Sequence, residues 1–204
     1  FVIIGIVCVF MWLKIKDITK NQVTEHVSEY SHMVALSIDN NFENELDLLS
    51  ESTALVDIEN GKLNDIFEEQ EGVSYGVMRI DGTAAYGEKL EFSDYDGFFQ
   101  AVRGNPSVCI KDEKILFAVP VYNGANVKYV LYKLYDREAI EKKMSLVCYG
   151  GMGECFLTDS EGNTILRSVN SKEKPYEFNK ESNAEAIKEI QDKMNINVSA
   201  AAYS

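Results

Sequence analysis

The sequence predicts an α+β fold in which a long N-terminal helix precedes a five-stranded antiparallel sheet with helices on one face. Two observations lead to this class: an uninterrupted helical period occupies the start of the chain, and short strand-like segments separated by turn residues follow it. After residues 150–153 a hairpin pattern begins again and stops early, which predicts a second, incomplete unit of the same kind. We therefore divide the chain into residues 1–13, 14–60, 61–147 and 148–204.

The first thirteen residues carry no charge, and Lys14 and Lys16 follow at once. A helix of that length spans about 20 Å, whereas the hydrocarbon core of a bilayer is about 30 Å thick. Because the chain begins with Phe1 rather than Met, we expect this segment to be the end of a transmembrane helix, with Trp12 as an interfacial anchor. A buried helix of a soluble core and a signal-peptide core are the alternatives, although no small-residue cleavage site follows.

The segment from Ile15 to Val56 contains no proline. Apolar side chains recur along it in steps of three and four, as on one face of an α-helix: Val27, Tyr30, Val34, Ile38, Phe42, Leu46 and Leu49. About forty residues form a helix of about 60 Å, long enough to carry a domain away from a membrane. We therefore predict a stalk helix over residues 14–60 and a homodimer formed through it.

Five strands are predicted from alternating apolar segments and the turns between them. They lie at 73–80 and 83–86 around the Asp81-Gly82 turn, at 108–111 and 115–122, and at 127–135 after the Asn123-Gly124 turn.

Three helices are predicted around these strands, at 63–70, from about 94 to Arg103 and from 137 to about 146, with Gly104 as the C-terminal stop of the second. In the second unit we expect a hairpin over 154–168 and a helix over 183–194.

Composition and spacing exclude several classes of function. Acidic residues outnumber basic ones by 33 to 20, for a formal net charge of −13. A surface that binds nucleic acid needs a basic face, so we expect no nucleic-acid partner. The two histidines, His26 and His32, are six residues apart and do not face each other on a helix. No metal-ligand spacing is present, and we expect neither a metal site nor a cofactor.

One segment, Gly72–Gly76 (GVSYG), matches the G-x-S-x-G nucleophile elbow as a string. The elbow needs a strand before it, a helix after it and a histidine downstream, and all three conditions fail here. No lysine directly follows Gly150, Gly151 and Gly153, so we interpret this segment as a hinge rather than a phosphate loop. We therefore expect no catalytic residue and no enzymatic activity in this chain.

Polar groups among aromatic side chains are the better candidates for function. On the predicted strands, Arg79 lies on the same alternate face as Tyr75, and a pocket that combines tyrosine hydroxyls with an arginine suits a small polar or anionic ligand. The predicted ligand-binding residues are Tyr75, Arg79, Phe99, Arg103, Tyr122 and Tyr129. Pairing of Arg79 with a surface carboxylate is the alternative.

Two of the four cysteines, Cys148 and Cys155, bracket the glycine hinge. A loop of that size can close as a disulfide outside the cell, and two buried thiols are the alternative. Cys109 would then remain unpaired on a strand.

Three segments resemble those of the double Cache sensor domain, in which a membrane helix and a long extracytoplasmic helix precede two PAS-like units. They are Phe98–Gly104 (FFQAVRG), Phe117–Gly124 (FAVPVYNG) and Phe156–Ile165 (FLTDSEGNTI). The resemblance implies a membrane-distal PAS-like unit at 61–147 and the start of a membrane-proximal one at 148–204. This sequence differs from the amino-acid-binding members of the family, which carry a Trp-Tyr pair at the positions of Phe98-Phe99 and an arginine near the position of Asp96.

This resemblance implies a small-molecule sensor of a bacterial transmembrane receptor, anchored in the cell membrane, with residues from about 14 onward extracytoplasmic. The output would be a diguanylate cyclase, histidine kinase or chemotaxis domain in the cytoplasm. The alternative function is a ligand-free dimerisation or spacer module of a membrane protein.

Overall fold

The computed structural model of the chain describes residues 2–55, 70–87, 89–90, 96–111, 113–144, 155–158, 164–168 and 188. The chain divides into two units, one of Phe1–Ser37, Leu157–Thr164 and Lys172–Ser204, the other of Ile38–Phe156 and Ile165–Ser171. The sheet and the candidate site belong to the second of these units.

The long helix predicted at the N-terminus is confirmed as α1, Val2–Ser52, and a 3-10 turn, Thr53–Leu55, follows it. It ends at Ser52, short of the predicted residue 60, and in its last turn Ser52 Oγ donates to Leu48 O, while Thr53 Oγ1 donates to Ser50 O. No helix among the described residues has an apolar stretch long enough to cross a membrane. The assignment of residues 1–13 to the end of a transmembrane helix stays a prediction.

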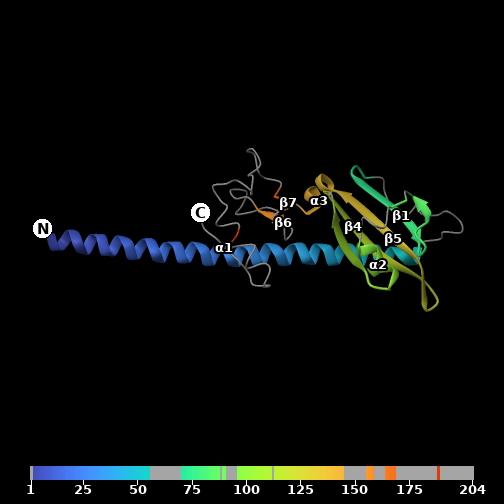
Figure 1. Cartoon of the computed structure of the whole chain (residues 1–204), viewed down its shortest axis with the longest axis horizontal. Coiled ribbons are helices and arrows are strands. Elements are labelled where there is room, and N and C mark those ends of the chain that lie inside the picture. Colours follow the sequence, from blue (N-terminus) through green and yellow to red (C-terminus); the bar gives the residue numbers. More distant parts are fainter. Residues whose placement is uncertain are drawn as a thin grey trace. The chain divides into compact units, whose positions relative to one another are not determined.

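Five antiparallel strands form one sheet in the order β2-β1-β5-β4-β3. The strands are β1 (Val73–Arg79), β2 (Ala84–Gly87), β3 (Ser107–Lys111), β4 (Lys114–Asn123) and β5 (Asn126–Asp136). Figure 1 shows β4 and β5, the long central strands, beside the C-terminal part of α1. The predicted α+β fold class and its five-stranded sheet are confirmed.

Helices cover both faces of this sheet, so the expectation of helices on one face was wrong. On the α1 face, the ring of Phe42 meets that of Phe117 edge-on at 5.5 Å between centroids. On the opposite, α2 face, Phe98 and Ala101 of α2 (Asp96–Val102) pack in a buried cluster with Tyr132. The physical reason lies in β4, where every residue from Ile115 to Val121 is buried and both faces therefore need cover.

The predicted turns are present at nearly the predicted positions. In the β1–β2 hairpin, the Arg79 amide donates to Thr83 O, so the loop also includes Ile80. Gly82 adopts φ 89° in this loop, and Gly104 adopts φ 94° after α2, a conformation that is readily available only to glycine. The stop predicted at Gly104 is confirmed.

After β5, the helix α3 (Arg137–Met144) begins directly, and a separate two-stranded sheet follows, with β6 (Phe156–Thr158) paired to β7 (Thr164–Arg167). The carboxylate of Glu141 in α3 accepts the amide of Arg167 at 2.9 Å. The hairpin predicted over 154–168 is thus present. The helices predicted at 63–70 and 183–194 lie outside the described residues, except for Gln70 and Lys188.

Candidate ligand-binding site

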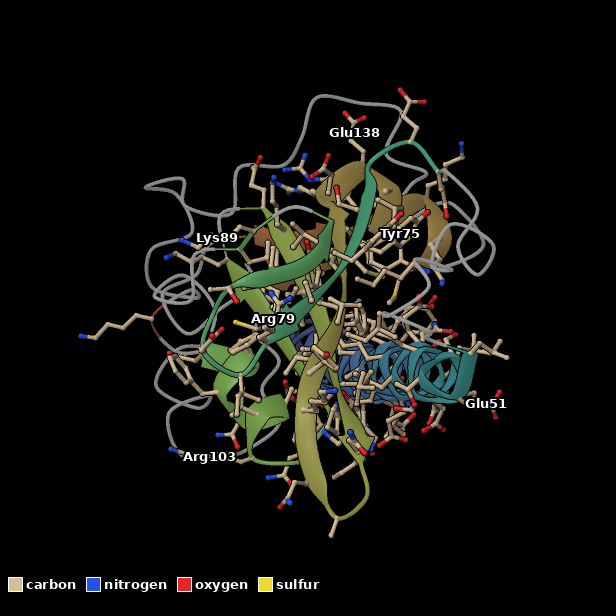
Figure 2. The ribbon with its side chains drawn as sticks, turned by 90° about the vertical axis from the view of Figure 1, so that its right-hand side faces the viewer. Glu51, Tyr75, Arg79, Lys89, Arg103 and Glu138 are labelled. Carbon is tan, nitrogen blue, oxygen red and sulfur yellow. The ribbon has the colours of Figure 1, made fainter. Side chains whose placement is uncertain are left out.

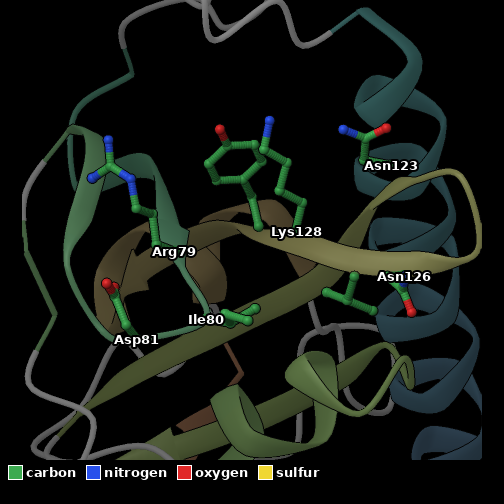
Figure 3. Close-up of a pocket in the computed structure, with 8 residues that line it drawn as sticks. Arg79, Ile80, Asp81, Asn123, Asn126 and Lys128 are labelled. Atoms are coloured by element: carbon green, nitrogen blue, oxygen red, sulfur yellow. The ribbon is translucent and has the colours of Figure 1, made fainter.

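A cavity of about 420 Å³, open to solvent and lined mostly by exposed residues, lies where the end of β1 meets the start of β5. Eight residues line it: Arg79, Ile80, Asp81, Asn123, Asn126, Val127, Lys128 and Tyr129. Figure 3 shows Arg79 and Lys128 directed to the same side of the strands. The volume is within the range of small-molecule sites, about 300 to 1,000 Å³.

Strand pairing brings these residues together from three segments of the chain. Arg79, the last residue of β1, pairs with Tyr129 near the start of β5. Because both pairings of β5 are antiparallel, the turn after β1 and the turn before β5 lie at the same end of the sheet. The first turn contributes Asp81, and the second is flanked by Asn123 and Asn126.

A β-bulge explains how Lys128 joins the cavity. Val121 pairs with Tyr129, but the next residue of β4, Tyr122, pairs with Val127, which leaves Lys128 as an extra residue in β5. A bulge breaks strict alternation and redirects the extra side chain. The Lys128 ammonium lies over the Tyr129 ring, 5.2 Å from its centroid.

The guanidinium of Arg79 is held by the hairpin that follows it. Its Nη1 donates to Ala84 O at 2.9 Å and to Thr83 Oγ1 at 3.3 Å. Asp81 Oδ1 accepts both the amide of Thr83, at 2.9 Å, and its hydroxyl, at 2.8 Å. These hydrogen bonds lower the pKa of Asp81 below its ordinary value, so its carboxylate is ionised at neutral pH.

The six predicted ligand-binding residues divide between the two faces of the sheet. Arg79 and Tyr129 meet in the cavity. Tyr75 shares their α1 face but lies farther along β1, opposite Lys133. In Figure 2, Tyr75 lies toward α3, whereas Arg103 points outward at another edge of the ribbon.

The other three predicted residues lie around α2. Phe99 is 49% exposed and meets Phe98 edge-on, Arg103 is exposed, and Tyr122 OH donates to Gly104 O at 3.1 Å just after the helix. These three residues are therefore separated from Arg79 and Tyr129 by the sheet.

The sequence did not predict Asp81, Asn123, Asn126 and Lys128 as lining residues, nor the apolar Ile80 and Val127. A signal for the first three was present, because they flank the two turns that were predicted. Antiparallel pairing of β1 with β5 would have placed those turns together. Lys128 had no such signal, since simple alternation assigns it to the face opposite Tyr129.

A second polar cluster connects the α1 face of the sheet to α1 itself. Glu45 of α1 has a side chain only 4% exposed, and its Oε1 accepts Lys133 Nζ at 2.7 Å and Tyr135 OH at 2.5 Å. Its Oε2 accepts Nζ of Lys143 from α3, which also donates to Tyr135 OH. One buried carboxylate therefore joins three elements of the fold.

These contacts determine the charge of the Glu45 carboxyl. Burial by itself raises the pKa of Glu45, but hydrogen bonds from Lys133, Lys143 and Tyr135 outweigh it, and the pKa is lowered. Burial and the bond to Glu45 raise the pKa of Tyr135, so its hydroxyl stays a donor. The cluster is thus an anion held by two ammonium groups and one phenol.

Stability should consequently depend on acid pH through Glu45. Its folded-state pKa lies below the ordinary 4.5, so its contribution is present above that pH and is lost as pH falls through the folded pKa. We expect the difference in free energy of unfolding between the wild type and Glu45→Gln to be constant near neutral pH and to shrink below about pH 4.5. Urea denaturation at several pH values measures it, and a difference unchanged down to pH 3 would contradict the assignment.

The structure tests only part of the prediction that Cys148 and Cys155 form a disulfide and leave Cys109 unpaired. Cys155 is disulfide-bonded and Cys109 is free. Cys148 lies outside the described residues, so the pairing of Cys148 with Cys155 stays a prediction.

Comparison with known proteins relates this fold to solved structures. No protein-family model and no curated protein matches the sequence. The ligand-binding domain of the Campylobacter jejuni chemoreceptor Tlp3 in complex with 4-methylisoleucine is 11% identical, with TM-score 0.55 over 76% of this chain and 73% of that one. The complex with L-valine is 9% identical, with TM-score 0.51 over 78% and 77%.

A further structure of the Tlp3 (CcmL) sensory domain is 10% identical, with TM-score 0.52 over 74% of each chain. At these identities the likeness concerns the fold. The chain therefore has the Cache, PAS-like fold of chemoreceptor ligand-binding domains.

Proposed function

We propose that this chain is the small-molecule-sensing domain of a bacterial signal-transduction receptor. The observation that carries the proposal is the cavity of about 420 Å³, built by side chains that include Arg79 and Tyr129, in a sheet with the fold of chemoreceptor ligand-binding domains. A cavity with a few convergent polar groups is the expected form of a small-molecule site.

Arg79 and Tyr129 are the proposed ligand contacts in this cavity. Tyr75, Phe99, Arg103 and Tyr122 do not line this cavity, so their role as ligand contacts stays a prediction from the sequence and is not part of the proposed site. The chain itself is proposed to be non-enzymatic.

Strand β5 offers a route from the ligand to α1. Tyr129 at its start lines the cavity, and Lys133 and Tyr135 farther along bind Glu45 of α1. A ligand that favours one position of β5 over another would bias α1 only by its difference in affinity for the two states.

The wider setting of the domain is also a proposal. Residues 1–13 would be the end of a membrane helix, and residues from about 14 onward would lie outside the cytoplasm. The output would be a diguanylate cyclase, histidine kinase or chemotaxis domain on the cytoplasmic side, and the receptor would be a homodimer through α1.

A ligand-free dimerising spacer is the second candidate function. Apolar side chains are exposed along α1, including Val23 at 39%, Val27 at 37% and Met33 at 59%. Such a surface suits pairing of two helices.

A thermal-shift screen of the chain against amino acids, carboxylates, amines, sugars and nucleobases tests the sensing function. Amino acids belong in it because the Tlp3 structures contain L-valine and 4-methylisoleucine. A ligand at one hundred times its dissociation constant should stabilise the folded state by about 2.7 kcal/mol, because it binds only that state. A blank screen together with a concentration-dependent dimer would reject the sensor in favour of the spacer.

A further inference from the structure

We infer that the cavity at the β1–β5 end of the sheet binds a small organic oxyanion, whose carboxylate or phosphate group is held between Arg79 and Lys128. This inference rests on the proposed sensing function and names the class of its ligand.

The charge of the cavity points to an anion. Its lining contains two cations, Arg79 and Lys128, against one carboxylate, Asp81, in a chain whose formal net charge is −13. That carboxylate already accepts two hydrogen bonds from Thr83 through Oδ1. The lining therefore carries more positive than negative groups, although the chain as a whole is acidic.

Arg79 is placed to bind an oxyanion with a fixed geometry. Both of its hydrogen bonds to the hairpin come from Nη1, to Thr83 and to Ala84. An arginine has five N–H donors in a planar fork, so, as far as the described residues go, donors on Nε and Nη2 are left over after these two. Because the hairpin orients the fork beforehand, less side-chain entropy is lost when a ligand binds.

Lys128 supplies the second positive group. Within the described part of the chain its ammonium makes no ion pair, and its one recorded interaction is with the ring of Tyr129. The bulge in β5 is what brings it to this side of the strand. An oxyanion between Lys128 and Arg79 would give Lys128 an anionic partner and would give Arg79 one in addition to the nearby carboxylate of Asp81.

The rest of the lining indicates an organic molecule rather than a bare ion. Ile80 and Val127 provide apolar surface, and the amides of Asn123 and Asn126 can both donate and accept hydrogen bonds. The volume of about 420 Å³ accommodates a carbon skeleton beside the charged group.

Matched pairs of probes test the charge requirement on the whole chain by isothermal titration calorimetry. The pairs are acetate and acetamide, succinate and succinamide, benzoate and benzamide, and glycerol phosphate and glycerol, with inorganic phosphate and 1,4-diaminobutane added. We expect at least one anion to bind about tenfold or more tightly than its uncharged partner, and 1,4-diaminobutane to bind less tightly than that anion. The carboxylate and phosphate pairs distinguish the two oxyanions.

Variants of Lys128 test whether the preference for an anion over its uncharged partner arises in the cavity. Lys128→Gln should lower the affinity for the preferred anion about tenfold, or by about 1.4 kcal/mol, and should leave the affinity for the uncharged partner unchanged. Lys128→Arg should bind the anion with an affinity within about threefold of that of the wild type. Lys114→Gln is the matched control, because Lys114 is an exposed lysine at the opposite end of β4. Raising the salt concentration should weaken binding of the anion, because salt screens the charges, and this effect should be smaller in Lys128→Gln.

Two results would overturn the inference. If no anion binds more tightly than its uncharged partner while the thermal-shift screen yields a neutral or cationic ligand, the sensing function stands and the anion site fails. An anion bound equally well by the wild type and by Lys128→Gln places the ligand elsewhere. If nothing binds in either experiment, the proposed function fails as well.

Discussion

Replacing Glu45 by alanine is expected to lower the free energy of unfolding by about 3 kcal/mol, the usual cost of removing one partner of a buried ion pair. The truncation leaves the Lys133 ammonium, whose side chain is 17% exposed, and the buried Tyr135 hydroxyl without their acceptor. Lys143, with a side chain 38% exposed, can turn toward water and should contribute less.

Urea denaturation of the chain followed by circular dichroism measures this change. Glu43→Ala is the matched control, because Glu43 is exposed on the same helix two residues earlier and should change stability by less than about 0.5 kcal/mol. If the two variants were equally stable, the Glu45 cluster would contribute nothing to stability, and the proposed route along β5 would lose its support.

A methyl group added at Gly76 is expected to destabilise the sheet by about 3 kcal/mol, at the upper end of overpacking costs. The new Cβ would lie 2.5 Å from Tyr132 OH and 2.7 Å from two ring carbons, whereas a normal contact is longer than 3.4 Å. Tyr132 cannot move aside, because it is fully buried and pairs with Gly76 on one side and Ala118 on the other. The small neighbours are what make room for the ring.

A double-mutant cycle separates this clash from a general intolerance of alanine in β1. In a Tyr132→Leu background, which removes the ring, Gly76→Ala should cost less than about 1 kcal/mol. Equal costs of Gly76→Ala in the two backgrounds would show that the ring is not responsible.

Much of the fold could be predicted from the sequence because the relevant signals are local. The helical period and the lack of proline predicted α1, and alternation between turn residues predicted the five strands. The glycine after α2 was predicted as a stop because its conformation at φ 94° depends only on the residue itself. The end of α1 at Ser52, rather than at residue 60, was not predicted.

The candidate site could be predicted only in part. Arg79 and Tyr129 were selected separately, each for its chemistry, and the register between β1 and β5 brings them together. Phe99, Arg103 and Tyr122 were grouped with them because a sequence does not tell which face of a sheet a helix covers. In β4, every residue from Ile115 to Val121 is apolar, so the sequence gives no preference for the face of the strand on which a helix packs.

Glu45 and Lys128 show what required the tertiary structure. The apolar period of α1 correctly selected Ile38 and Leu49 as buried residues, but it could not select Glu45, a charged residue that is buried through its hydrogen bonds with Lys133 and Tyr135. Lys128 reaches the cavity because one residue of β5 has no partner in β4. The helix period, the alternation along strands and the turn residues are properties of neighbouring residues, so they could be predicted from the sequence. The sheet face that each helix covers, the strand register and the bulge arise from pairing between distant segments, so only the tertiary structure determines them.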